Sequence, residues 1–105
     1  MNSMKIMLCC GAGMSSGMLA QRARKAAKKQ GLDVDVSARS ESDVQNYFQD
    51  IDILFLGPHL AIHLEELSNM AEPFGVPVLV IPKNIYGMLD GEALLRLANE
   101  ALENR

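Results

Sequence analysis

Short apolar segments alternate with helical patterns along this 105-residue chain, and that alternation limits its fold more than any other feature. Four segments have the apolar or alternating character of strands: residues 4–9, 32–38, 52–57 and 76–82. Helices are expected at residues 16–30, 39–50, 59–72 and 91–103, with the polar segment 39–50 only weakly packed. Strands that alternate with helices form right-handed βαβ units. We therefore predict a three-layer α/β sandwich in which a four-stranded parallel sheet, in the order 2-1-3-4, carries helices on both faces.

Length, charge and cysteine content narrow the class of protein. The length suits one domain spanning residues 1–105. The net charge of −3 gives no general electrostatic reason to bind nucleic acid or an anionic membrane. No apolar run approaches the roughly 20 residues that span a bilayer, and no signal-peptide cleavage site follows the N-terminus. We expect a cytoplasmic protein, not inserted in the membrane, whose adjacent Cys9 and Cys10 are reduced thiols.

The sequence "CGAGMSSG" (10–17) follows the first predicted strand. Ligands of such sheets bind at the carboxyl ends of the strands, where the strand order reverses, and Cys10 is expected at that point. The glycine spacing is one residue too long for a dinucleotide-binding loop, and the chain has no nucleotide P-loop motif. A glycine-bearing loop before a helix N-terminus forms a nest of N–H groups that binds anions. Because a nest of this kind lowers the pKa of a thiol and holds phosphate, the sequence predicts that Cys10 is a nucleophile that carries a phosphoryl group.

The two cysteines could also serve other functions. A cysteine phosphatase of the C-x₅-R-[ST] kind needs an Arg six residues after the Cys to clamp the phosphoryl oxygens. Position 16 is Ser16, which favours a carrier and leaves a low-molecular-weight cysteine phosphatase-like enzyme as the alternative. A disulfide between adjacent cysteines is strained, and Cys9 is expected to be a buried packing residue. A non-catalytic binding domain on the same fold is a third hypothesis.

Three motifs give the chain a family resemblance. They are "CGAGMSSGML" after the first strand, "LGPHLA" after the third and "YGMLDG" before the last helix. In order and approximate spacing they match a family in which C-x-A-G-M-S-[ST]-S, G-P-Q-x-A and Y-G-x-x-D-G recur. Over essentially its whole length, the chain resembles the enzyme IIB component of the lactose/cellobiose (diacetylchitobiose) family of the phosphoenolpyruvate-dependent sugar phosphotransferase system. The related galactitol and ascorbate IIB proteins have C-G-x-G loops and lack the later motifs.

The resemblance implies a cysteine-phosphatase-like fold and a phosphotransferase acting from protein phosphocysteine to sugar, without a bound cofactor. It implies that Cys10, rather than Cys9, accepts phosphate from a phosphohistidine of the cognate IIA protein. The phosphate then passes to a sugar bound by the membrane-embedded IIC protein. The backbone N–H groups that would hold the phosphate belong to Gly11, Ala12, Gly13, Met14, Ser15 and Ser16, and a hydroxyl of Ser15 or Ser16 would add a hydrogen bond.

Two residues of the later motifs are expected to border the site. His59 stands where the family often has Gln, and it is either a donor to a phosphoryl oxygen or a solvated substitute. Tyr86 matches the family's Tyr, and packing alone is an equally good explanation. His59 and His63 are four residues apart, but no third metal ligand is evident, so no metal is expected.

Two further features have simpler explanations. Asp90 is expected to cap the last helix. One face of the first helix could meet an acidic rim on IIA or IIC, or simply be solvated. Its residues are Met18, Arg22, Lys25 and Lys29.

Overall fold

The computed structural model describes residues 4–10 and 14–103. Its strands are β1 (Met4–Cys10), β2 (Val34–Ser40), β3 (Ile53–Leu56) and β4 (Val78–Val80). Its α-helices are α1 (Met14–Lys29), α2 (Leu64–Ala71), α3 (Lys83–Met88) and α4 (Gly91–Glu103). Three 3₁₀ helices complete it, η1 (Val44–Asp50), η2 (Pro58–His63) and η3 (Glu72–Phe74). None of the helices in these ranges combines the length and apolar character needed to cross a bilayer.

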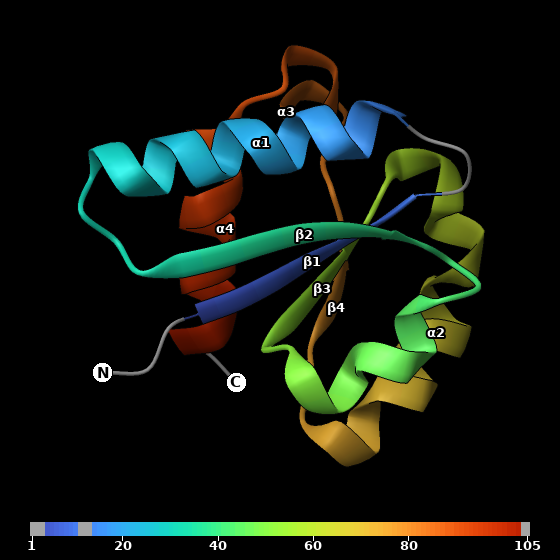
Figure 1. Cartoon of the computed structure of the whole chain (residues 1–105). Helices are drawn as coiled ribbons and strands as arrows, with labels where there is room; N and C mark the ends of the chain where they lie inside the picture. The colour runs from blue at the N-terminus through green and yellow to red at the C-terminus, as the bar shows by residue number, and fades with distance from the viewer. Residues whose placement is uncertain (1–3, 11–13, 104–105) are drawn as a thin grey trace.

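The four strands form one parallel sheet in the order β2-β1-β3-β4, which confirms the predicted topology (Figure 1). β1 is central and pairs with β2 along its whole length, from Met4 opposite Val34 to Cys10 opposite Ser40. On its other side β1 pairs with β3, where Cys9 lies opposite Leu56. Cys10 thus ends an inner strand of the sheet.

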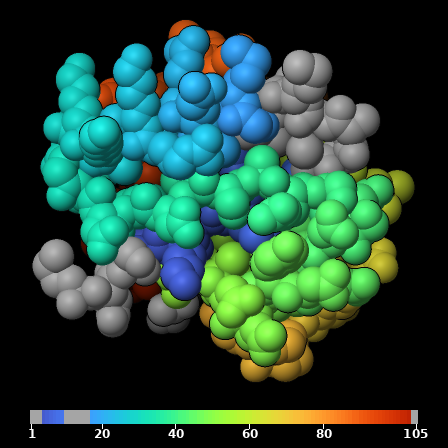
Figure 2. All heavy atoms as spheres, in the orientation of Figure 1, coloured from blue at the N-terminus to red at the C-terminus, as the bar shows by residue number. Residues whose placement is uncertain are grey.

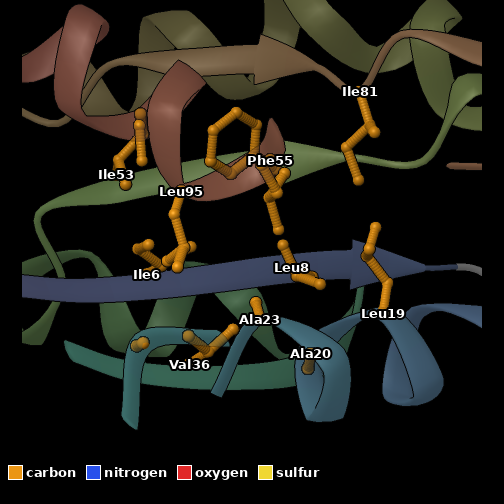
Figure 3. Close-up of a cluster of buried hydrophobic side chains, with 13 residues drawn as sticks. Ile6, Leu8, Leu19, Ala20, Ala23, Val36, Ile53, Phe55, Ile81 and Leu95 are labelled. Carbon is orange, nitrogen blue, oxygen red and sulfur yellow. The ribbon is translucent and has the colours of Figure 1, made fainter. Parts of the chain in front are cut away.

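One face of the sheet packs against α1 and α4. Ile6 and Leu8 of β1 lie between Phe55 of β3 and the α1 residues Leu19 and Ala23 (Figure 3). All five side chains are at most 1 % exposed. Leu19 and Ala23 are four residues apart and share one face of α1, so the helix turns an apolar face to the sheet.

The other face packs against η1, η2 and α2. Met7 and Cys9 of β1 share this second core with Leu54 and Leu56 of β3. The 3₁₀ helix η1 adds Val44 and Phe48, whose side chains are almost fully buried. The expectation of a weakly packed segment at 39–50 is wrong. These two apolar side chains, four residues apart, are enough to anchor the polar segment to the sheet.

Several element boundaries also differ from the prediction. β2 continues to Ser40, so the first residues of the predicted helix 39–50 belong to the strand. The predicted helix 59–72 is divided into η2, α2 and η3. Pro58 opens η2, and Pro73, which has no N–H donor, lies just beyond the end of α2. The predicted loop before the last helix contains α3, whose first turn is closed by the Tyr86 N–H donating to the Pro82 carbonyl at 3.0 Å.

Candidate functional site

Cys10 lies at the carboxyl end of β1, between the ends of β2 and β3. The chain leaves β1 towards α1 on one face of the sheet, whereas the segment joining β2 to β3 runs along the other face (Figure 1). The strand order therefore reverses beside β1, and crevices that hold ligands in open parallel sheets form at such points. Cys9, one residue earlier, is fully buried in the second core, as predicted.

The predicted loop residues Gly11, Ala12 and Gly13 lie outside the described residues, as do the side chains of Cys10, Met14, Ser15 and Ser16. The structure does give the start of α1 at Met14, two residues earlier than expected. The first turn of α1 contains no acidic residue. The partial positive charge of this helix N-terminus is therefore not neutralised by a carboxylate of its own first turn.

Gly57 connects β3 to β1 at this edge of the sheet. Its N–H donates to the Cys9 carbonyl at 3.1 Å, which fixes the peptide unit that joins Cys9 to Cys10. Its carbonyl accepts the N–H of Leu60 at 2.9 Å and so begins η2. A side chain at this position would be crowded, because a Cβ atom on Gly57 would lie 2.6 Å from Cε1 of His59. In the sequence Gly57 is only the last residue of the predicted strand 52–57, whereas in the structure it holds the end of β1 in place.

His59 and Tyr86 are brought together, although 27 positions separate them in the sequence. Their ring centroids are 6.0 Å apart with an interplanar angle of 57°. The His59 side chain is exposed, and that of Tyr86 is half-buried against the core on the α1 side. Tyr86 therefore packs against the core and also contacts the ring of His59, and its place at the border of the site stays a prediction.

Ser40 belongs to this edge and was missed from the sequence. It ends β2 directly opposite Cys10. Its hydroxyl lies 3.0 Å from the Ser42 hydroxyl and donates to the Asp43 carboxylate at 3.1 Å. In the sequence the alternation of apolar and polar residues stops at Ala38, because Arg39 and Ser40 are both polar, so no local signal marked Ser40 as part of the strand.

The side chain of Asp90 caps α4, as predicted. Its Oδ1 atom accepts the Ala93 N–H at 3.1 Å, which is the bond of an N-cap residue. A structural role therefore accounts for this carboxylate.

His63 is directed into different contacts from His59. Its Nε2 atom lies 3.3 Å from Oε2 of Glu41, and its Nδ1 atom lies 3.9 Å from Oε2 of Glu66. Because η2 is a 3₁₀ helix, residues four apart do not share a face as they would on an α-helix. Among the side chains that the structure describes, which do not include that of Cys10, no group of three or more from His, Cys, Asp or Glu could hold a metal ion.

Known proteins resemble this chain over nearly its whole length. A family model described as "PTS system, Lactose/Cellobiose specific IIB subunit" matches residues 5–97. The galactose-specific EIIB component of the PTS of Lactococcus lactis is 36% identical over 102 residues, covering 92% of this chain and 94% of the relative. A cellobiose-specific EIIB component of the same species has the same identity and coverage.

Two solved structures share the fold. The cellobiose-specific phosphotransferase IIB component of Borrelia burgdorferi superposes with a TM-score of 0.81 at 35% identity, covering 98% of this chain and 94% of that one. The lactose-specific IIB domain of Streptococcus pneumoniae superposes with a TM-score of 0.87, covering 94% and 97%; at 18% identity this likeness concerns the fold alone. With motifs, fold, family model and relatives in agreement, this chain belongs to the lactose/cellobiose-specific IIB family of the phosphotransferase system.

Proposed function

We propose that the 105 residues act as one phosphocarrier domain on the cytoplasmic side of the membrane, with Cys10 as the residue that carries phosphate. The donor is a phosphohistidine of the cognate IIA protein. The acceptor is a sugar bound by the membrane-embedded IIC protein. The protein is then a protein-phosphocysteine–sugar phosphotransferase.

The observation that carries this proposal is the position of Cys10 relative to α1. Cys10 ends an inner strand, and a 16-residue helix without a carboxylate in its first turn begins four positions later. A helix N-terminus of this kind favours negative charge, first that of a thiolate and then that of a phosphoryl group. The hydrogen bond from Gly57 to the Cys9 carbonyl supports the same role, because it holds the strand end from which the nucleophile extends.

The transfer consists of two substitutions at phosphorus. In the first, the Cys10 thiolate forms an S–P bond while the N–P bond of the donor phosphohistidine breaks, and the imidazole leaves with the bonding electrons. In the second, a sugar hydroxyl oxygen forms an O–P bond while the S–P bond breaks. The hydroxyl proton is released, and the electron pair returns to sulfur.

The remaining residues of the proposed site hold the phosphoryl group between these steps. The loop from Gly11 to Ser16 supplies backbone N–H donors, with a hydroxyl of Ser15 or Ser16. His59 adds a donor at the rim, in a position supported by its contact with Tyr86. Ser16 stands where a cysteine phosphatase has its Arg clamp, and the lack of that clamp protects the carried phosphate from transfer to water.

The relatives support the proposed partners, but their names do not point to one particular sugar. Galactose-specific and cellobiose-specific components are equally similar to this chain. In the lactose-specific EIICB component of Lacticaseibacillus casei, 24% identical over 85 residues, the name itself joins IIB to IIC. We therefore assign the choice of sugar to the membrane partner.

Transfer from a radiolabelled, phosphorylated IIA protein tests the proposal. We expect label on the wild-type chain and on Cys9→Ala, a matched control that removes the buried neighbouring thiol, and none on Cys10→Ser. Label that persists in Cys10→Ser, or that disappears equally in Cys9→Ala while the variant remains folded, contradicts the assignment. Rapid turnover of an aryl phosphate that depends on Cys10 would favour the phosphatase alternative instead.

A further inference from the structure

Positive and negative charges are segregated along the chain. Helix α1 carries five of the ten Lys and Arg residues and no Asp or Glu. The rest of the chain has the other five cations and all 13 acidic residues, a net charge of −8. Residues 40–82 contain seven acidic residues and no Lys or Arg. The overall charge of −3 is thus the sum of +5 on α1 and −8 on the rest of the chain.

The fold places helix α1 and the acidic segment 40–82 on opposite faces of the sheet, whereas α4, with Glu92, Glu100 and Glu103, lies on the same face as α1. Helix α1 packs on one face, whereas η1 and α2, which lie within residues 40–82, pack on the other. Figure 2 shows the blue-to-cyan side chains of α1 along one edge of the molecule, next to the teal surface of β2, with the green surface that follows β2 farther from that edge. A molecule polarised in this way turns its α1 side towards an anionic surface, even though its net charge is negative.

The cations of α1 are available for an external partner. All five side chains are exposed. Arg24 is engaged through Nη1, which donates to the Val36 carbonyl. The other four, Arg22, Lys25, Lys28 and Lys29, make no ion pair with any carboxylate of the described residues. They extend over a helix about 24 Å long, at 1.5 Å per residue.

The shape of this surface favours a flat array of anions over a single acidic segment. Beside α1 lies an open groove of about 410 Å³ that Arg22, Lys25 and Lys29 line on one side. Asp90 and Glu92 line its other side, so an acidic peptide that entered the groove would meet carboxylates. A planar anionic surface does not enter the groove, and it can contact the exposed cations of α1 from outside it.

If the protein works at the cytoplasmic side of the membrane, as proposed, α1 is more complementary in charge to the lipid surface than to the loops of a membrane protein. Cytoplasmic loops of membrane proteins carry an excess of Lys and Arg, which would repel α1. The cytoplasmic leaflet carries anionic lipids, which attract basic segments lying near it. Exposed Met18, in the second turn of α1, and exposed Met88, which lines the groove with Arg22 and Lys25, add apolar side chains beside these cations.

We infer that the basic face of α1, formed by Arg22, Lys25, Lys28 and Lys29, docks the protein reversibly on anionic phospholipid headgroups. The contact is peripheral and electrostatic, without insertion. If the proposed function is correct, it raises the local concentration of the carrier beside a membrane-embedded acceptor.

Vesicle co-sedimentation of the full chain tests this inference. Vesicles of phosphatidylglycerol and phosphatidylcholine in equal parts are compared with vesicles of phosphatidylcholine alone, at about 0.05 M and about 0.5 M salt. We expect binding only to the anionic vesicles, and loss of that binding at the higher salt concentration. No binding to anionic vesicles, or equal binding to neutral ones, overturns the inference.

Two charge-reversal variants distinguish the effect of the α1 face on vesicle binding from the effect of net charge. Lys25→Glu/Lys29→Glu and the control Lys83→Glu/Arg96→Glu each change four charge units, from −3 to −7. We expect the α1 variant to lose vesicle affinity by at least about fivefold per reversed cation, and the control to lose far less. Equal losses in two folded variants, as judged by circular dichroism, overturn the inference. So does a wild-type chain that ignores vesicles yet needs Lys25 and Lys29 to bind the IIA protein.

Vesicle binding should not depend on phosphoryl transfer. Cys10→Ser should bind the anionic vesicles as the wild-type chain does, because docking requires no chemistry at sulfur. Vesicle binding by a chain that accepts no phosphate would refute the proposed function alone. Phosphorylation of a chain that ignores vesicles would refute the docking alone.

Discussion

Gly57 shows how one residue without a side chain can arrange a site. Its N–H holds the carbonyl of Cys9, and its missing Cβ leaves room for the ring of His59. Its φ of −58° is open to any residue, so the glycine is required by space rather than by backbone conformation. The sequence shows a Gly-Pro strand end, but the imidazole that lies against it becomes visible only in three dimensions.

Substituting Gly57→Ala should disturb the site more than the fold. The added Cβ would meet the end of a flexible, exposed side chain, which can swing away from Tyr86. We expect the free energy of unfolding to change by less than about 1 kcal/mol, because Gly→Ala lowers the conformational entropy of the unfolded chain and so offsets part of the crowding. The His59 ring resonances in NMR spectra should shift, and the rate of phosphoryl transfer should fall.

Gly87→Ala is the matched control, because a Cβ at Gly87 meets nothing within 4 Å. It should leave both the His59 resonances and the transfer rate unchanged. An unshifted His59 ring in Gly57→Ala would contradict the close contact.

At the scale of elements, the sequence predicted most helices and strands because their apolar residues recur with clear periods. The stripe of Leu94, Leu95 and Ala98 predicted the buried face of α4 in this way. The segment 39–50 was misjudged because its few apolar residues show no sustained period. Val44 and Phe48 are nevertheless buried, because they pack against the apolar side chains on the face of the sheet that carries Cys9.

The anchoring role of η1 predicts a large effect for Phe48→Ala. Phe48 is 2 % exposed, and its ring centroid lies 5.9 Å from that of Phe74. Removing the ring should lower the free energy of unfolding by about 3–5 kcal/mol in urea denaturation. The neighbouring Gln49→Ala, at an exposed position, should change it by no more than about 0.5 kcal/mol. Similar small effects in both variants would restore the view that this segment is weakly packed.

The crossing of α1 and α4 depends on Gly91. A Cβ at this position would lie 2.5 Å from the backbone N of Ala23 and from the carbonyl carbon of Arg22. Backbone atoms cannot rotate away as a side chain can, so the two helices would have to separate. Gly91→Ala should therefore lower the thermal stability, at a cost of about 1–3 kcal/mol. Gly87→Ala again serves as the control, and an unchanged melting temperature in Gly91→Ala would contradict the close crossing.

At the scale of the whole molecule, the strand order and the edge that carries the site followed from the sequence. Right-handed crossovers leave few arrangements for four strands that alternate with helices. The glycine-rich loop after β1 indicated that the candidate site lies at the carboxyl end of this strand. The pairing of Ser40 with Cys10 and the separate contacts of His59 and His63 could not be predicted. They depend on where β2 ends and on η2 being a 3₁₀ helix, and neither has a strong local signal.

Charge segregation also belongs to this scale. Net charge alone gave no reason to expect an anionic partner, because it averages α1 with the acidic segment 40–82. Only the fold shows that the sheet separates the two.

Phosphorus NMR of the chain after incubation with the phosphorylated IIA protein tests the central claim most directly, because the chemical shift identifies the atom that bears the phosphoryl group. Phosphocysteine at Cys10 predicts one thiophosphate resonance in the wild-type chain and in Cys9→Ala, and none in Cys10→Ser. A phosphohistidine resonance on this chain, or a thiophosphate signal that survives in Cys10→Ser, would contradict it.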